Sequence, residues 1–154
     1  MVRLDDLPSG MRGHLENAPC PGFNTAPWVT GPPLTRRRVA VISTAGLHTR
    51  DDRPFTRDAG DLYRIIPGDV RADDLVMSHV SVNFDRSGFL QDWNVVFPID
   101  RIRELVADGE IGSMADYHYS FMGADDPMRW EVPARRLAGL LKQDGVDAAM
   151  LIPV

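Results

Sequence analysis

The chain has 154 residues, of which 44% are hydrophobic and 25% charged, as expected for one soluble globular domain with its own core. The formal net charge of −5 argues against nucleic acids and anionic membranes as partners. No stretch approaches the roughly 20 apolar residues of a membrane-spanning helix, and Met1–Asp6 lacks a signal-peptide core. We therefore expect a cytoplasmic protein.

Residues 1–38 are predicted to form an extended, proline-rich arm. They contain half of the 12 prolines, and proline fixes φ and removes a backbone donor, which excludes a regular helix or a central strand. Phe23, Trp28 and Leu34 would anchor the arm on the domain or on a neighbouring subunit. The single cysteine, Cys20, excludes an internal disulfide and has no base beside it in the sequence, so an inert side chain is favoured over a reactive thiol.

Residues 39–154 alternate apolar strands with helices. Helices are predicted from Pro98 to a stop at Gly109, and from about Pro133 to a stop at Gly145. The predicted strands are Val39–Thr44, Tyr63–Ile66, Leu75–His79, Val95–Phe97 and Asp147–Ile152. This alternation predicts a three-layer, Rossmann-like α/β domain whose mostly parallel sheet is flanked by helices. The last strand has no covering helix after it, so we expect the domain to be incomplete at its C-terminus.

The stretch Asp74–Pro98 is predicted to be a strand, a polar loop and a second strand. It carries His79, Asn83, Asp85, Asp92 and Asn94 within twenty residues. Histidine suits proton transfer near neutral pH, a carboxylate beside it sets its tautomer, and asparagine donors can hold a carboxylate or an oxyanion. Alternatively, the aspartates and asparagines cap backbone groups and His79 is a satisfied strand-end residue. On spacing alone, the second interpretation is favoured.

Two further histidines are candidates. His48 follows the first strand, and ligands of open α/β sheets bind beyond the carboxyl ends of strands. His118 lies in the aromatic segment Tyr117–Gly123, which is more typical of a core. These histidines and nearby aspartates could also hold zinc, iron or nickel, although no H-x-x-x-H or H-x-H pair is present. Thr44–Gly46 has too few glycines for a dinucleotide fingerprint and is predicted to be a tight turn.

Several segments, taken in order, resemble the selenoprotein B family of glycine, sarcosine, betaine and D-proline reductases. The likeness is greatest to the short subunit of the D-proline-reductase type, and the order and spacing agree from about residue 27 to the end. The matching segments are Val39–His48, Ile66–Val70, Ser78-His79, Asp92–Arg101, Gly109–Ser113 and His118–Gly123.

The resemblance implies a redox activity. In such proteins the strand matching Met150–Val154 is followed at once by a selenocysteine or cysteine, the redox nucleophile that attacks a substrate carbon–nitrogen bond. The chain stops before that position, and Cys20 lies in a different segment. We therefore expect the N-terminal part or subunit of a reductase for a small amine or amino-acid-like substrate, either truncated at a selenocysteine codon or naturally short. It would act as a homo-oligomer or with a partner reductase subunit.

On this hypothesis His79 is the general acid, since a departing amine must be protonated. Asp85 or Asp92 would orient His79, and Asn94 would position the substrate. His48 and His118 would line the cleft from neighbouring strand ends. Two other functions stay open, namely a non-catalytic binding or assembly subunit of a reductase complex, and a metal-dependent enzyme with histidine and aspartate ligands.

Overall fold

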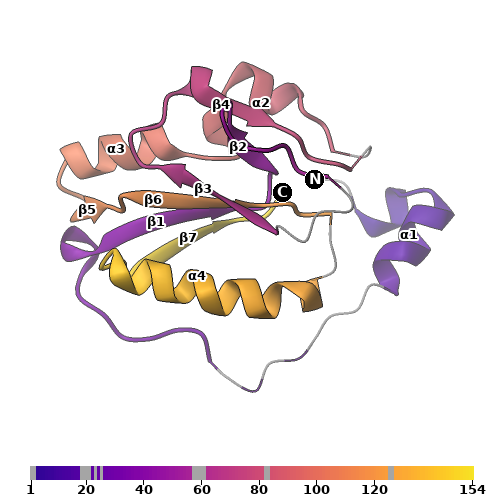
Figure 1. The fold of residues 1–154 in the computed structure, drawn as a ribbon. Coiled ribbons are helices and arrows are strands. Elements are labelled where there is room, and N and C mark those ends of the chain that lie inside the picture. Colours follow the sequence, from indigo (N-terminus) through magenta and orange to yellow (C-terminus); the bar gives the residue numbers. More distant parts are fainter. Residues whose placement is uncertain are drawn as a thin grey trace.

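A five-stranded mixed sheet forms the centre of the computed structural model (Figure 1). The structure describes residues 3–17, 22, 24, 26–56, 62–81, 84–124 and 127–154. The strands of this sheet are β1 (Arg38–Ser43), β3 (Tyr63–Pro67), β5 (Ser113–Met114), β6 (Tyr117–Phe121) and β7 (Ala148–Ile152). β1 lies at the centre and pairs in parallel with β5, β6 and β7, whereas β3 pairs antiparallel with β6.

The predicted α/β class is confirmed, and three of the four described strand pairings in the main sheet are parallel. The antiparallel strand β3 makes the sheet mixed, so the predicted Rossmann-like parallel arrangement needs correction. A parallel crossover needs a connection of a dozen or more residues, usually a helix. The described residues between β1 and β3 hold no helix and instead contribute β2 (Leu47–Thr49). β2 pairs antiparallel with β4 (Leu75–Met77) in a second, two-stranded sheet. The chain therefore enters β3 from the other end, antiparallel to its neighbour.

The helices predicted in the second half of the chain are confirmed. The structure has α1 (Ser9–Glu16), α2 (Ser87–Gln91), α3 (Ile99–Ala107) and α4 (Glu131–Gln143). Gly109 and Gly145 follow α3 and α4 with φ of 76° and 68°, the left-handed conformation that ends a helix. Pro133 lies in the first turn of α4, where a backbone N–H would have no acceptor within the helix, so proline is tolerated there. No helix among the described residues is long and apolar enough to cross a membrane.

Two predicted elements were wrong. Val95–Phe97 is not a strand, because Trp93–Val95 forms a 3-10 turn and the Phe97 N–H donates to the Trp93 carbonyl at 2.9 Å. The predicted extended arm contains α1, which begins directly after Pro8, so proline precedes this helix rather than interrupting it. The division into an arm and a domain stays a prediction, and Cys20 lies outside the described residues.

Two hydrophobic clusters cover opposite faces of the main sheet. Alternate residues of β1 point to opposite faces, so Val39 and Val41 join one cluster and Ile42 packs against the other. The first cluster includes Ile99 and Ile102 of α3, and the second includes Leu137 of α4. Figure 1 shows α4 on one face, and α3 with β2 and β4 on the other. The carboxyl ends of β1, β6 and β7 remain together at one edge.

An ion pair fixes the opposite, amino edge of the sheet. Arg38 of β1 donates to Asp144 Oδ1 at 2.5 and 3.0 Å and to the Met114 carbonyl at 2.6 Å. Asp144 Oδ2 accepts the N–H groups of Asp116 and Tyr117. Burial raises the pKa of Asp144, but the bond from Arg38 and these N–H groups outweigh burial and hold it below its ordinary value. The end of α4 is thus attached to β1 and to the break between β5 and β6.

Candidate functional site

A pocket of about 280 Å³ lies where the parallel strands end. It is lined by His79, Ser81, Phe84, Gly123, Ala124 and Val154. Gly123 and Val154 each lie two residues after the ends of β6 and β7. Ligands of open α/β sheets bind outside the carboxyl ends of their strands, so this pocket is the strongest candidate for a functional site.

A glycine turn places His79 at this edge. Gly46, between β1 and β2, has φ of 66°. Its N–H donates to the Phe121 carbonyl at 2.8 Å and its carbonyl accepts the Ser78 N–H at 3.0 Å. A Cβ at this position would lie 3.0 Å from the Cα of His79, so only glycine allows so close an approach. His79 is therefore held against the end of the main sheet.

Thr44 joins the strand ends beside the pocket. The Val154 N–H donates to Thr44 Oγ1 at 2.8 Å, and the Gly123 N–H donates to the Thr44 carbonyl at 2.9 Å. A Cβ on Gly123 would lie 2.8 Å from that carbonyl oxygen, so the chain here also requires a residue without a side chain. The predicted tight turn after the first strand thus links the ends of β6 and β7.

The hydrogen bonds of His79 define its tautomer. Its Nδ1 accepts the Ser81 N–H at 3.2 Å, so in the neutral ring the proton lies on Nε2. Burial, and to a smaller degree the charge of Arg86, lower the pKa of His79. Its Nε2 is buried and has no hydrogen-bond partner within the described part of the chain. His79 is therefore a neutral hydrogen-bond donor at neutral pH in the free protein.

Arg86 and Phe84 hold the His79 segment in place. The Arg86 guanidinium donates to the His79 carbonyl and, at 3.3 Å, to the Ser81 carbonyl. The Phe84 ring packs against the imidazole with their centres 4.8 Å apart. These residues support His79 through its backbone and one ring face and leave its Nε2 without a partner.

The other polar residues predicted in this loop act as caps. Asp85 Oδ1 accepts the Ser87 N–H at 2.9 Å at the start of α2, and hydrogen bonds from the side chain and then the backbone of Ser87 lower the pKa of Asp85. Asp92 Oδ1 accepts the backbone and side-chain N–H groups of Asn94, both at 2.9 Å. Asn94 Oδ1 accepts the Asp100 N–H in the first turn of α3. None of the three predicted residues lines the His79 pocket.

The two remaining histidines are buried and also lie outside that pocket. His48 Nδ1 lies 2.7 Å from the Thr49 carbonyl, to which it donates. His118 Nδ1 accepts the Val41 N–H at 2.9 Å, and burial lowers its pKa to about 4. His118 therefore completes the hydrogen bonding of β1 from inside the core. No three potential metal ligands meet among the described residues, and Asn83 is not one of these residues.

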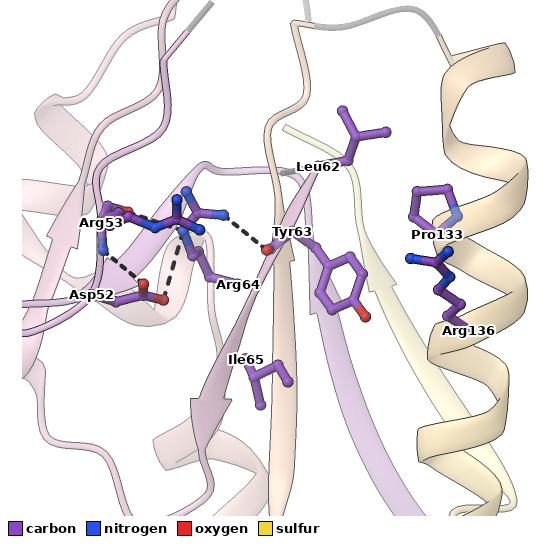
Figure 2. A pocket seen from close by; sticks show the side chains of 8 residues that line it. All are labelled: Asp52, Arg53, Leu62, Tyr63, Arg64, Ile65, Pro133 and Arg136. Carbon is purple, nitrogen blue, oxygen red and sulfur yellow. Dashed lines mark hydrogen bonds and ion pairs between the residues drawn. The ribbon is translucent and has the colours of Figure 1, made fainter. Parts of the chain in front are cut away.

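A larger pocket, of about 410 Å³, was missed by the sequence analysis (Figure 2). It lies beside the start of β3 and α4, and its lining includes Arg53, Tyr63, Arg64 and Arg136. The sequence did not predict this pocket, because Arg136 looks like an ordinary charged residue on the solvated face of a helix and Tyr63 like an ordinary strand residue.

Comparison with known proteins finds one family. The model of glycine/sarcosine/betaine reductase selenoprotein B matches residues 62–153. The D-proline reductase subunit gamma of Acetoanaerobium sticklandii is 37% identical over 116 residues, which cover 73% of this chain and 47% of that protein. The betaine reductase complex component B subunit beta of Peptoclostridium acidaminophilum is 29% identical over 77% of this chain and 28% of its own length. The chain spans about half the length of these relatives or less, and no solved structure matches it.

Replacing Gly46 by alanine should displace His79. The positive φ alone costs about 1 kcal/mol, and the contact with His79 adds to this, so we expect a loss of about 2–3 kcal/mol in the free energy of unfolding. Gly109→Ala is the matched control, because Gly109 has a similar φ but nothing lies within 4 Å of an added Cβ. Only Gly46→Ala should also shift the NMR signals of the His79 ring. Equal losses and unchanged His79 signals in both variants would contradict this account.

His118 should make stability fall in mild acid. The unfolded chain protonates this ring near its ordinary pKa of 6.5, whereas the folded chain resists protonation until about pH 4. Between these values the unfolded state binds more protons, so the free energy of unfolding should drop between pH 7 and 5, by on the order of 1–2 kcal/mol. His118→Gln keeps an acceptor for Val41 but does not titrate. Urea unfolding at both pH values should show a smaller drop in this variant, and an unchanged drop would refute the assignment.

Proposed function

Since this chain belongs to the glycine/sarcosine/betaine reductase selenoprotein B family, we propose that it is a component of a reductase complex that cleaves a carbon–nitrogen bond of a small amine or amino-acid-like substrate. One observation carries this proposal: the pocket at the strand ends is lined by both His79 and Val154. By the family resemblance, the redox cysteine or selenocysteine directly follows the position of Val154. A substrate in this pocket would lie between that nucleophile and the His79 ring.

The size of the pocket supports a small substrate. About 280 Å³ suits a molecule of amino-acid size. The relatives are named as reductases of D-proline, betaine and glycine, which are compounds of this size. The Phe84 ring provides an apolar wall, and Gly123 keeps the opposite wall free of a side chain.

The proposed role of His79 changes during the reaction. In the free protein it is neutral, and its Nε2–H is buried without a hydrogen-bond partner in the described part of the chain, so an oxygen or an anion that enters the pocket would have to approach this group closely to accept its hydrogen bond. A thiolate or selenolate close to the ring would raise the pKa of His79, because a negative charge favours the imidazolium. The nucleophile would attack the carbon, the carbon–nitrogen bond would break, and the imidazolium would give its proton to the departing amine. Two thiols of a reductant would then cleave the bond between the sulfur or selenium of the nucleophile and the carbon fragment. The two thiols would become a disulfide, the carbon fragment would take up a proton, and the thiolate or selenolate would be restored.

His79 substitutions test this role in a full-length reductase complex. His79→Phe keeps an aromatic ring against Phe84 but neither donates nor titrates, so release of the amine should fall at least about a hundredfold. His14→Gln, on the exposed surface of α1, is the control and should leave the rate unchanged. Co-purification of the subunits should be unaffected in both variants. Full activity of His79→Phe would remove the pocket as the reaction site and favour a binding or assembly subunit.

The gene provides an independent test of the nucleophile. We expect an in-frame cysteine codon, or a UGA codon followed by sequence typical of a helix, immediately after the codon of Val154. Sequencing through this position decides the point. A UAA or UAG stop codon there would contradict the proposal that a redox residue directly follows Val154 in this protein.

A further inference from the structure

The larger pocket, between β3 and α4, is separate from the His79 pocket and shares no lining residue with it. Figure 2 shows Tyr63 and Arg136 on the α4 side of β3, whereas Arg64 extends to the opposite side. The strand thus divides the arginines of this pocket into two groups with different surroundings.

Arg64 is engaged within the protein. It is only 5% exposed, and its guanidinium donates to the carbonyls of Arg53 at 2.9 Å and Tyr63 at 3.0 Å. It also stacks over the Phe55 ring at 4.5 Å and lies 3.6 Å from Asp52 Oδ2, which offsets its charge. Arg64 therefore holds the wall of the pocket and is not available to a ligand.

Arg136 is in the opposite situation. It lies on α4 and makes no hydrogen bond or ion pair to any described residue. Its neighbour Arg135 is not part of the pocket lining and donates to Glu131 Oε1 at 2.8 Å. The Arg136 side chain is exposed, so its guanidinium is solvated and can pair with an anion that enters the pocket.

Tyr63 adds a second donor on the same side. Its ring is fixed by edge contact with Tyr119 at 6.0 Å and by packing on Phe121 at 5.3 Å. Its hydroxyl makes no hydrogen bond within the described part of the chain. Beside these donors, Leu62, Ile65 and Pro133 form an apolar wall. The α4 side of the pocket thus combines the Arg136 guanidinium, the Tyr63 hydroxyl and an apolar surface.

The free edge of β3 does not suit an added peptide strand. The Tyr63 carbonyl, which points away from β6, is already bonded to Arg64. Pro67 has no N–H, and its carbonyl accepts the Val70 N–H at 3.1 Å. Strand addition requires a row of free backbone donors and acceptors, so this edge favours a small molecule over a peptide.

We propose that this pocket binds a small monocarboxylate with an apolar body. The carboxylate pairs with the Arg136 guanidinium, which can hold it with two parallel N–H groups, and accepts a bond from the Tyr63 hydroxyl. The apolar body packs on Leu62, Ile65 and Pro133. A single negative charge fits, because the charge of Arg64 is already offset by Asp52.

Isobutyrate, its uncharged isostere isobutyramide and inorganic phosphate test this proposal. Titrated into the ¹⁵N-labelled chain, isobutyrate should saturably shift the backbone amide signals of residues 62–65 and 134–136, and isobutyramide and phosphate should bind at least about tenfold more weakly. Arg136→Gln should weaken isobutyrate binding about tenfold or more, since a charge-assisted bond is lost. Arg135→Gln, with the same charge change one residue away, should bind isobutyrate as the unmodified chain does.

Three results would overturn the proposal: equal binding of isobutyramide, tighter binding of phosphate, or an equal loss in Arg135→Gln and Arg136→Gln. Shifts confined to the residues around His79 would place the carboxylate in the other pocket and equally contradict it. The spectra themselves report whether each variant is folded. The two proposals are tested separately, because amine release in a His79 variant reports on the reductase function and isobutyrate binding reports on this pocket. A His79 variant should lose amine release and still bind isobutyrate.

Discussion

The left-handed turn at Gly46 is the constraint on which the candidate site depends. Its N–H is bonded to β6 of the main sheet and its carbonyl to Ser78, just after β4 of the second sheet. One residue therefore joins both sheets at the edge where the parallel strands end. The close approach of the chain to His79 leaves no room for a side chain at this position. The position of His79 follows from backbone geometry and does not rely on a neighbouring carboxylate.

This arrangement gives His79 a specific chemical state. The Ser81 N–H occupies Nδ1 and burial lowers the pKa, so the ring is neutral and its proton faces away from Ser81, on Nε2. A neutral ring is a poor acid until a negative charge arrives in the pocket. The chemistry that we propose therefore depends on the strand end at Val154, which lines the same pocket. By the family resemblance alone, the proposed redox residue would follow that strand end.

Much of the fold was predictable because its signals are local. The apolar run that forms β1 and the glycines that end α3 and α4 are short-range features with few alternatives. The antiparallel direction of β3 could not be predicted, because it depends on how the chain travels between sheets. The turn at Trp93 was missed because an apolar run of this length is equally compatible with a strand.

The site shows a similar division. His79 was expected near a strand end, and it lies just after β4. For Asp85, Asp92 and Asn94, the sequence is the same whether the side chains cap backbone groups or bind a substrate. Only their contacts in the structure show that they cap backbone groups. The segment Asp92–Arg101 contributed to the family resemblance. In the structure, its polar side chains form hydrogen bonds within the segment.

The centre of that segment's network is Asp100, which accepts bonds from Trp93, Asn94 and Arg103. Arg103 in turn holds the carbonyl of Gly68. Side chains of this segment, together with Arg103, thus hold neighbouring loops in place.

The central claim is that the pocket at the strand ends is where the substrate reacts. A crystal structure of the reductase complex with an unreactive substrate analogue tests this claim most directly. We predict that the analogue lies between His79 and Val154, within hydrogen-bonding distance of the His79 ring. An analogue bound elsewhere, with the His79 pocket empty, would contradict it.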